Sequence, residues 1–347
     1  TGATGNTQAV TVAAGNNINI DIIDSNLHAN ENGYAIIMFD EATVTVKDSE
    51  VNAWAAAYFK NTGAEDSSGS NVTFDNCAIL TQSPEVDKHY SFGTFVFENV
   101  SNVTLDVRNC DITAIRGENS EDVQLQNVIR LATSGTDNGI TLENNDITLD
   151  EEYPSFVYDL KPDQNDSVKV VSGTFSQPVD ISEYIAEGAV FFPNEDGTYS
   201  VDDETAAIAA GMTAVIGKTA YATLVEAVAA VGDGETITMI ADDLNASGVI
   251  VSSGSNFTID FNGHTFVVTQ NLAGSTGTKS QVFQLLKDST ITMKNGTLRG
   301  GVSGVKMIIQ NYADLTLEGM TLDAAGSVNT ACEALSVNNG DVVIKGN

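Results

Sequence analysis

Acidic residues far outnumber basic ones among the side chains of this sequence that can carry chemistry, with 47 Asp plus Glu against 15 Lys plus Arg. Carboxylate oxygens are the ligands that Ca²⁺ prefers. Asp242 and Asp243 are adjacent in the chain and are candidate calcium ligands. Because Ca²⁺ takes about six to eight oxygens, other loops would have to supply the rest. The alternative for this pair is a solvated acidic turn.

Four aromatic residues form a second group with chemical potential. Trp54, Tyr58, Tyr90 and Phe92 fall near loops that follow predicted strands. Exposed aromatic rings offer flat apolar faces on which sugar rings stack. These residues are therefore a candidate carbohydrate platform, and packing in the core or beneath loops is the alternative.

The charge balance excludes whole classes of partner. A formal net charge of −32 leaves too few cations for the phosphate contacts of a nucleic-acid-binding protein. The same charge argues against docking on anionic lipid. Apolar residues make up 42% of the chain, enough for a real core. Because the longest apolar stretches fall short of the roughly 18 residues of a membrane span, we expect no membrane insertion.

These side chains must be positioned by a repeated structural unit, since one eight-residue pattern recurs along the chain. Apolar residues occupy alternate positions, a turn of Asn, Asp or Gly follows, and another apolar residue closes the pattern. The pattern occurs at 20–27, 44–51, 72–79, 105–112, 140–147 and 168–175, and again at 259–266, 291–298 and 315–322. A further short strand precedes most of these units, so each repeat holds about three strands and three bends.

Stacking of such repeats predicts an all-β chain with a parallel β-helix fold, right-handed, in which each repeat is one coil. Coils would lie roughly 4.8 Å apart, the strand-pairing distance, with apolar residues in inward columns. A β-sandwich is the alternative, but it gives no reason for the same pattern to return every 24–35 residues.

Two cysteines occupy the same place in successive repeats. Cys77 and Cys110 each follow an Asn at the bend of the pattern. Stacked coils would bring their Cα atoms about 5 Å apart, within reach of a disulfide. Whether they bond or stack as small apolar residues is left open by the sequence.

The repeat breaks between about 176 and 256, which predicts two modules in tandem. We place the first at 1–201, a linker at 202–211 and the second at 212–347. An amphipathic helix is expected at about 222–231, with Thr223 as its N-cap. Such a helix would cover the open strand edges of the first coil of the second module.

Two segments carry a resemblance to a known family. Residues 217–239, followed by 257–266, resemble the start of pectate-lyase-like β-helix modules, and 173–180 through 199–201 looks like a segment that closes them. Such modules are common in large cell-surface, adhesin-like proteins of bacteria and archaea. The resemblance implies an extracellular location, at the cell surface or secreted.

The fold that the chain resembles also carries polysaccharide lyases and hydrolases. Those enzymes need carboxylates on adjacent coils together with a basic residue or a His. The sequence has four Arg and none of the motifs Asn-Thr-Asp, Gly-His-Gly or Arg-Ile-Lys. Asn262-Gly263-His264 is best read as a bend after a strand.

We therefore expect a non-catalytic surface protein, a rigid acidic stalk or adhesin whose loops bind a glycan or protein of a host or neighbouring cell. No cofactor is expected apart from a structural Ca²⁺. A polysaccharide-active enzyme is one alternative. A self-assembling filament or sheath subunit, joined end to end through open strand edges, is the other.

Overall fold

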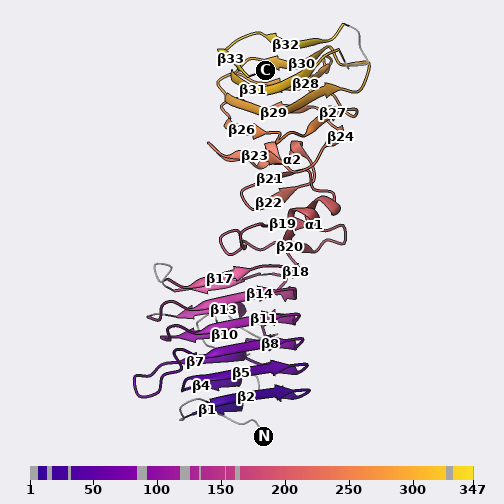
Figure 1. Ribbon diagram of the computed structural model, residues 1–347. Coiled ribbons are helices and arrows are strands. Elements are labelled where there is room, and N and C mark those ends of the chain that lie inside the picture. Colours follow the sequence, from indigo (N-terminus) through magenta and orange to yellow (C-terminus); the bar gives the residue numbers. More distant parts are fainter. Residues whose placement is uncertain are drawn as a thin grey trace. The chain divides into compact units, whose positions relative to one another are not determined.

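The computed structural model describes residues 7–13, 18–29, 33–83, 92–117, 126–132, 134–152, 154–160, 165–325 and 331–346. The chain is all-β, with 55% strand and 4% helix, and most of its strands run parallel in stacked sheets (Figure 1). This confirms the all-β prediction. Parallel pairing does not fit the β-sandwich alternative, whose sheets are antiparallel.

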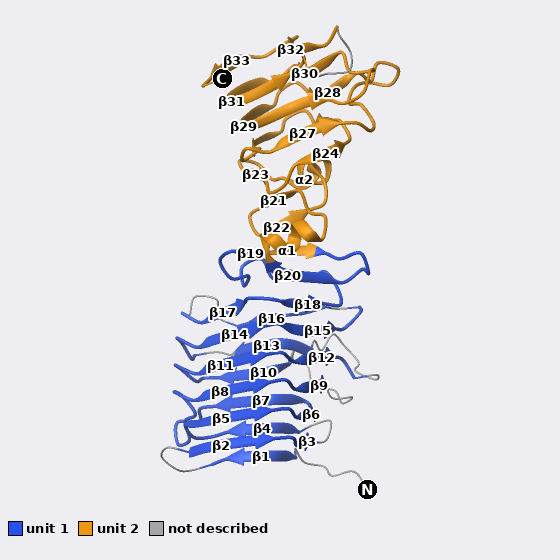
Figure 2. Ribbon diagram, turned by 45° about the vertical axis from the view of Figure 1, so that its right-hand side comes forward, with its two compact units in different colours: residues 1–189, 193–202 blue, residues 190–192, 203–347 orange. Residues whose placement is uncertain are grey.

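The chain divides into two compact units (Figure 2). Unit 1 comprises residues 1–189 and 193–202, and unit 2 comprises 190–192 and 203–347. The division near residue 202 lies close to the predicted module boundary, whereas the short stretch 190–192 belongs to the second unit.

Unit 1 contains three parallel sheets, and each passage of the chain adds one strand to each sheet. The first sheet consists of β1 (Gln8–Val12), β4 (Tyr34–Met38), β7 (Ala55–Lys60), β10 (Phe92–Glu98), β13 (Gln126–Ala132) and β16 (Val157–Asp159). The second consists of β2 (Ile18–Ile23), β5 (Ala42–Lys47), β8 (Asn71–Asp75), β11 (Thr104–Arg108), β14 (Gly139–Glu143) and β17 (Ser167–Val170). The third consists of β3 (Asn26–His28), β6 (Glu50–Ala53), β9 (Ala78–Gln82), β12 (Asp111–Ile115), β15 (Asn145–Leu149) and β18 (Gly173–Phe175).

The recurring pattern of the sequence corresponds to a strand of the second sheet, a bend and a strand of the third. Alternation along β5 buries Ala42, Val44 and Val46 and leaves Thr43 and Lys47 exposed. Val44, Val72, Leu105, Ile140 and Val168 then pair in register from strand to strand, which stacks them into one buried apolar column.

The bend between the second and third sheets requires a left-handed backbone residue. Asp24, Asp48, Asn76, Asn109 and Asn144 occupy this position with φ between 49° and 56°. Asn and Asp tolerate this region better than other non-glycine residues, because their short polar side chains bond locally. The same position in unit 2 holds Asn295 and Gly319, with φ of 60° and 62°.

The last strands of unit 1 are partly covered by the chain that follows them. The N–H of Val170 donates to the carbonyl of Tyr184, and the N–H of Ala186 donates to the carbonyl of Val170. β18 pairs antiparallel with β20 (Tyr199–Asp203), which follows β19 (Ala189–Pro193). These pairings end the parallel stacking and occupy strand edges that would otherwise be open.

Unit 2 begins with a helix where the sequence predicted a linker at 202–211. Asp203 caps α1 (Glu204–Ala209) by accepting a hydrogen bond from the N–H of Ala206, and Ala207 is fully buried. Ala207 packs with Met212 and Val215 in a small apolar cluster. Within the acidic run, Asp202 and Asp203 end β20, and Asp203 caps the helix that begins at Glu204, because an Asp before the first turn satisfies free backbone N–H groups.

The predicted capping helix is present as α2 (Leu224–Ala230). Thr223 is its N-cap as predicted, and it forms a reciprocal capping box with Glu226. Leu224 and Ala227 are buried in the core of unit 2, whereas Val225 stays 39% exposed. Val228 and Val231 pack partly buried against the same core.

The rest of unit 2 repeats the parallel arrangement. Two antiparallel strands, β21 (Ala214–Ile216) and β22 (Thr219–Tyr221), precede α2, and β21 also pairs with β23 (Thr236–Met239). Parallel strands follow: β24 (Asp243–Ala246), β25 (Val249–Val251), β26 (Asn256–Asp260), β27 (Thr265–Val268), β28 (Gln281–Leu285), β29 (Thr290–Gly300), β30 (Met307–Asn311), β31 (Asp314–Asp323), β32 (Glu333–Val337) and β33 (Val342–Lys345).

Candidate functional site

A cavity of about 560 Å³ lies in unit 1 beside the ends of β16 and the start of β17. Carboxylates and phenol rings dominate its polar lining. It is lined by Leu131, Val157, Tyr158, Asp159, Asp166, Ser167, Val168, Glu183 and Tyr184. Concave sites with a few convergent polar groups are the usual places for ligands, so this cavity is the candidate functional site.

The environment of Asp166 sets the electrostatics of the cavity. Its Oδ1 accepts hydrogen bonds from the backbone N–H and the side-chain amide of Asn138, each at 2.9 Å. Burial nevertheless raises the pKa of Asp166, and the negative charges of Asp159 and Asp137 raise it further. Burial also raises the pKa of Tyr184, which bonds to Glu183. The cavity therefore holds crowded negative charge next to a neutral phenol.

The lining can accept hydrogen bonds from hydroxyl or ammonium groups of a ligand. Asp159 ends β16, Asp166 directly precedes β17, and Tyr184 comes from the segment that follows β18. No sequence motif marked these residues, because only the fold brings the strand ends together.

The predicted aromatic platform is corrected by the structure for three of its four residues. Trp54, Tyr58 and Phe92 do come together, with ring centroids of Trp54 and Phe92 4.0 Å apart in a stacked arrangement. They are buried, with exposed fractions of 2%, 6% and 5%. Together with Tyr34 they form a hydrophobic cluster, so their faces pack on each other instead of on a sugar. Tyr90 lies outside the described residues.

The predicted calcium ligands have other partners. Asp242 Oδ1 accepts the backbone N–H of Thr265 at 2.8 Å and lies 3.2 Å from His264 Nδ1. Asp243 accepts the N–H of Asn245, and burial raises its pKa. Among the residues that the structure describes, no group of three or more His, Cys, Asp or Glu side chains is arranged to hold a metal ion.

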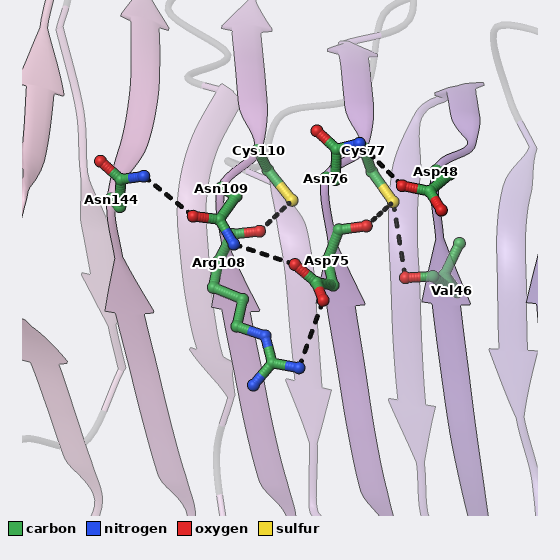
Figure 3. A network of polar contacts seen from close by, with 9 residues as sticks. All are labelled: Val46, Asp48, Asp75, Asn76, Cys77, Arg108, Asn109, Cys110 and Asn144. Atoms are coloured by element: carbon green, nitrogen blue, oxygen red, sulfur yellow. Dashed lines mark hydrogen bonds and ion pairs between the residues drawn. The ribbon is translucent and has the colours of Figure 1, made fainter.

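The two cysteines lie in neighbouring rungs of the bend, and both are buried free thiols (Figure 3). Next to them, amide side chains link consecutive strands along the left-handed position. Asn76 donates to Asp48 at 2.7 Å, and Asn144 donates to Asn109 at 2.8 Å.

An alternating column of charge, which no sequence motif indicated, flanks this bend. Lys47, Asp75, Arg108 and Glu143 pair in register on four consecutive strands, with Arg108 3.2 Å from Asp75. Unit 2 has the same column at the same place in its pattern. It runs Asp260, Lys294, Glu318, Lys345, with Lys294 3.1 Å from Asp260. We call these the charge ladders.

Comparison of the chain with protein-family models, with curated proteins and with solved structures gives no match. The resemblance to pectate-lyase-like modules therefore stays a prediction. In the described part of the chain, no helix has the length and apolar character needed to cross a membrane.

Proposed function

We propose that each unit is a right-handed parallel β-helix and that the chain is a non-catalytic extracellular scaffold, a stalk or adhesin segment of a cell surface. The observation that carries the proposal is the in-register stacking of parallel strands on three sides of each repeat. Right-handedness follows from the strong preference of parallel strand connections for that hand. The pectate-lyase-like family remains the best description of such modules.

The stacking supports a stiff scaffold, because each repeat is fixed to the next by more than sheet hydrogen bonds. At the bend, the N–H of Ser25 donates to Ser49 Oγ at 3.1 Å, and the N–H of Cys110 donates to Asn145 Oδ1 at 2.9 Å. Bonds between repeats at a bend resist the hinge motion that flexible loops would allow. An acidic coat adds solubility in the extracellular medium.

Loops between strands are the proposed contact points for a glycan or protein of a host or neighbouring cell. The loop after β7 has a defined shape, since Asn61 accepts the N–H of Gly63 and Ser67 Oγ accepts the N–H of Lys60. Ser67 is fully buried while Glu65 is exposed. A pre-shaped loop loses little entropy when it binds.

Surface exposure on the cells that make the protein tests this proposal. Intact cells are treated with a protease that does not cross membranes, and the chain is followed with an antibody beside a cytoplasmic marker. We expect the chain to be cleaved while the marker stays intact. Protection of the chain until the cells are broken would refute the extracellular assignment.

A polysaccharide-active enzyme is the second candidate, and the cavity at Asp159 and Asp166 is what favours it. Two carboxylates, one with a raised pKa, are the minimal set for acid–base cleavage of a glycosidic bond. A panel of polysaccharides incubated with the chain and with Asp166→Asn distinguishes the two functions. Release of reducing sugars that the variant abolishes would replace the scaffold proposal with the enzyme.

A further inference from the structure

The residues that directly follow the left-handed bend position of unit 1 form a column across the repeats. The column runs Ser25, Ser49, Cys77, Cys110, Asn145. Where a rung carries a side-chain oxygen, that oxygen accepts the backbone N–H of the rung that precedes it in the chain, as Ser49 Oγ does from Ser25 at 3.1 Å. Asn145 does the same for Cys110 at 2.9 Å. Side chains of the column thus accept backbone N–H groups of the preceding repeat.

Two adjacent rungs carry sulfur in place of oxygen. The thiols act here as donors: Cys77 Sγ donates to the carbonyl oxygens of Val46 and Asp75, and Cys110 Sγ donates to that of Arg108. Sulfur is a weaker acceptor than a hydroxyl oxygen, so Ser would serve the column better at both places. Backbone acceptance therefore does not explain why two neighbouring rungs are both Cys.

The geometry of the pair fits a covalent link. Ala78 and Asp111, the next residues along, are in register on parallel strands β9 and β12. Neighbouring parallel strands lie about 4.8 Å apart, within the Cα separation of about 4.4–6.8 Å that disulfides span. Cys77 Sγ lies 3.4 Å from the carbonyl oxygen of Asp75, and Cys110 Sγ lies 3.2 Å from that of Arg108. Figure 3 shows both sulfurs projecting to the same side of their strands.

We propose that Cys77 and Cys110 form a disulfide between neighbouring repeats when the chain folds in the presence of a small-molecule disulfide. The thiolate of Cys77 attacks one sulfur of that oxidant and expels the other as a thiolate. Cys110 then loses its proton to solvent and attacks the Cys77 sulfur of the mixed disulfide, releasing a second thiolate. Two thiols are oxidised, one external disulfide is reduced, and no other reactant is needed.

In the folded chain the two neighbouring thiols differ in acidity. The interaction of the two thiols lowers the pKa of Cys77, and the same interaction together with burial raises the pKa of Cys110. Both side chains are at most 3% exposed. We therefore expect the bond to form during folding and only slowly in the folded dithiol.

The test is to refold the reduced, unfolded chain with mixed reduced and oxidised glutathione, then alkylate free thiols and map peptides by mass spectrometry. We expect a peptide pair linked through Cys77 and Cys110, with Cys332 as the only alkylated cysteine. The link closes 33 residues of chain and should raise the melting temperature of the oxidised form by roughly 8–15 °C over the reduced form.

Three single variants serve as controls. Cys77→Ser and Cys110→Ser keep an acceptor in the column and should lose the dependence of the melting temperature on oxidant. Cys332→Ser should keep it. Alkylation of all three cysteines after oxidative refolding, or a link through Cys332, would overturn the proposal.

Discussion

Arg108 lies between two carboxylates in the charge ladder of unit 1, so reversing its charge tests whether the ladder stabilises the stacking. Arg108→Glu replaces attraction to Asp75 and Glu143 by repulsion from both. Arg108 is 51% exposed and Asp75 is 18% exposed, so each attraction is worth about 0.5 kcal/mol, as for other exposed pairs. Like charges directly opposite on neighbouring strands cost a similar amount.

Two lost attractions and two new repulsions give a destabilisation of about 2 kcal/mol. For a unit of about 200 residues this lowers the melting temperature by about 4–8 °C. The loss should shrink in about 1 M salt, where the screening length falls to about 3 Å. Differential scanning calorimetry at low and high salt measures both effects.

Two further variants separate the ladder from total charge. Lys169→Glu makes the same change in net charge on an exposed residue of β17, but its register partner is Thr141, so we expect a change within about 0.5 kcal/mol. Arg108→Glu combined with Glu143→Lys restores the net charge and one attraction, and should recover about half of the loss. An equal loss in the Arg108 and Lys169 variants would refute the reasoning.

Three other perturbations follow from the contacts. Thr223→Ala removes the capping box of α2 and should cost unit 2 about 1 kcal/mol in urea unfolding, with no change in unit 1. Asn145→Ala leaves the buried N–H of Cys110 and carbonyl of Val107 without their partner and should cost about 2–4 kcal/mol, whereas Asn145→Ser should cost less. The hydrogen bond from Asn109, aided by Arg108, lowers the pKa of Asp75. Its stabilisation is therefore present above the unfolded pKa of about 3.9 and is lost as the pH falls through the lower folded value. When the free energy of unfolding is measured as a function of acid pH, Asn109→Gly should weaken the pH dependence that Asp75 contributes. An unchanged curve would contradict a role for the Asn109 hydrogen bond.

The repeat was predictable because its signal is periodic in the chain itself. Alternating apolar residues followed by Asn, Asp or Gly determine both the inward face of a strand and the left-handed bend, and both are local properties. Thr223 was predictable for the same reason, since an N-cap is read from adjacent residues.

The aromatic platform was wrong because spacing does not tell what covers a residue. Trp54 and Phe92 are 38 residues apart and meet only when β7 and β10 lie side by side, where their rings bury each other. The cavity was missed for a related reason, since Glu183 and Tyr184 join Asp159 and Asp166 in its lining only when the segment after β18 packs against the earlier strands. Neither burial nor a cavity is a local property of the sequence.

The charge ladders explain how so acidic a chain tolerates stacked strands. A repeat that placed an acid at the same outward position in every coil would set like charges about 4.8 Å apart, each pair unfavourable. At the position directly before the bend the pattern avoids this by alternating sign, and four of the 15 Lys and Arg residues are used there: Lys47, Arg108, Lys294 and Lys345. A coil slipped by one repeat would place Asp75 against Glu143, or Lys294 against Lys345. The scarce cations therefore favour the native order of coils over slipped ones, a specificity that the apolar columns lack because their members are interchangeable.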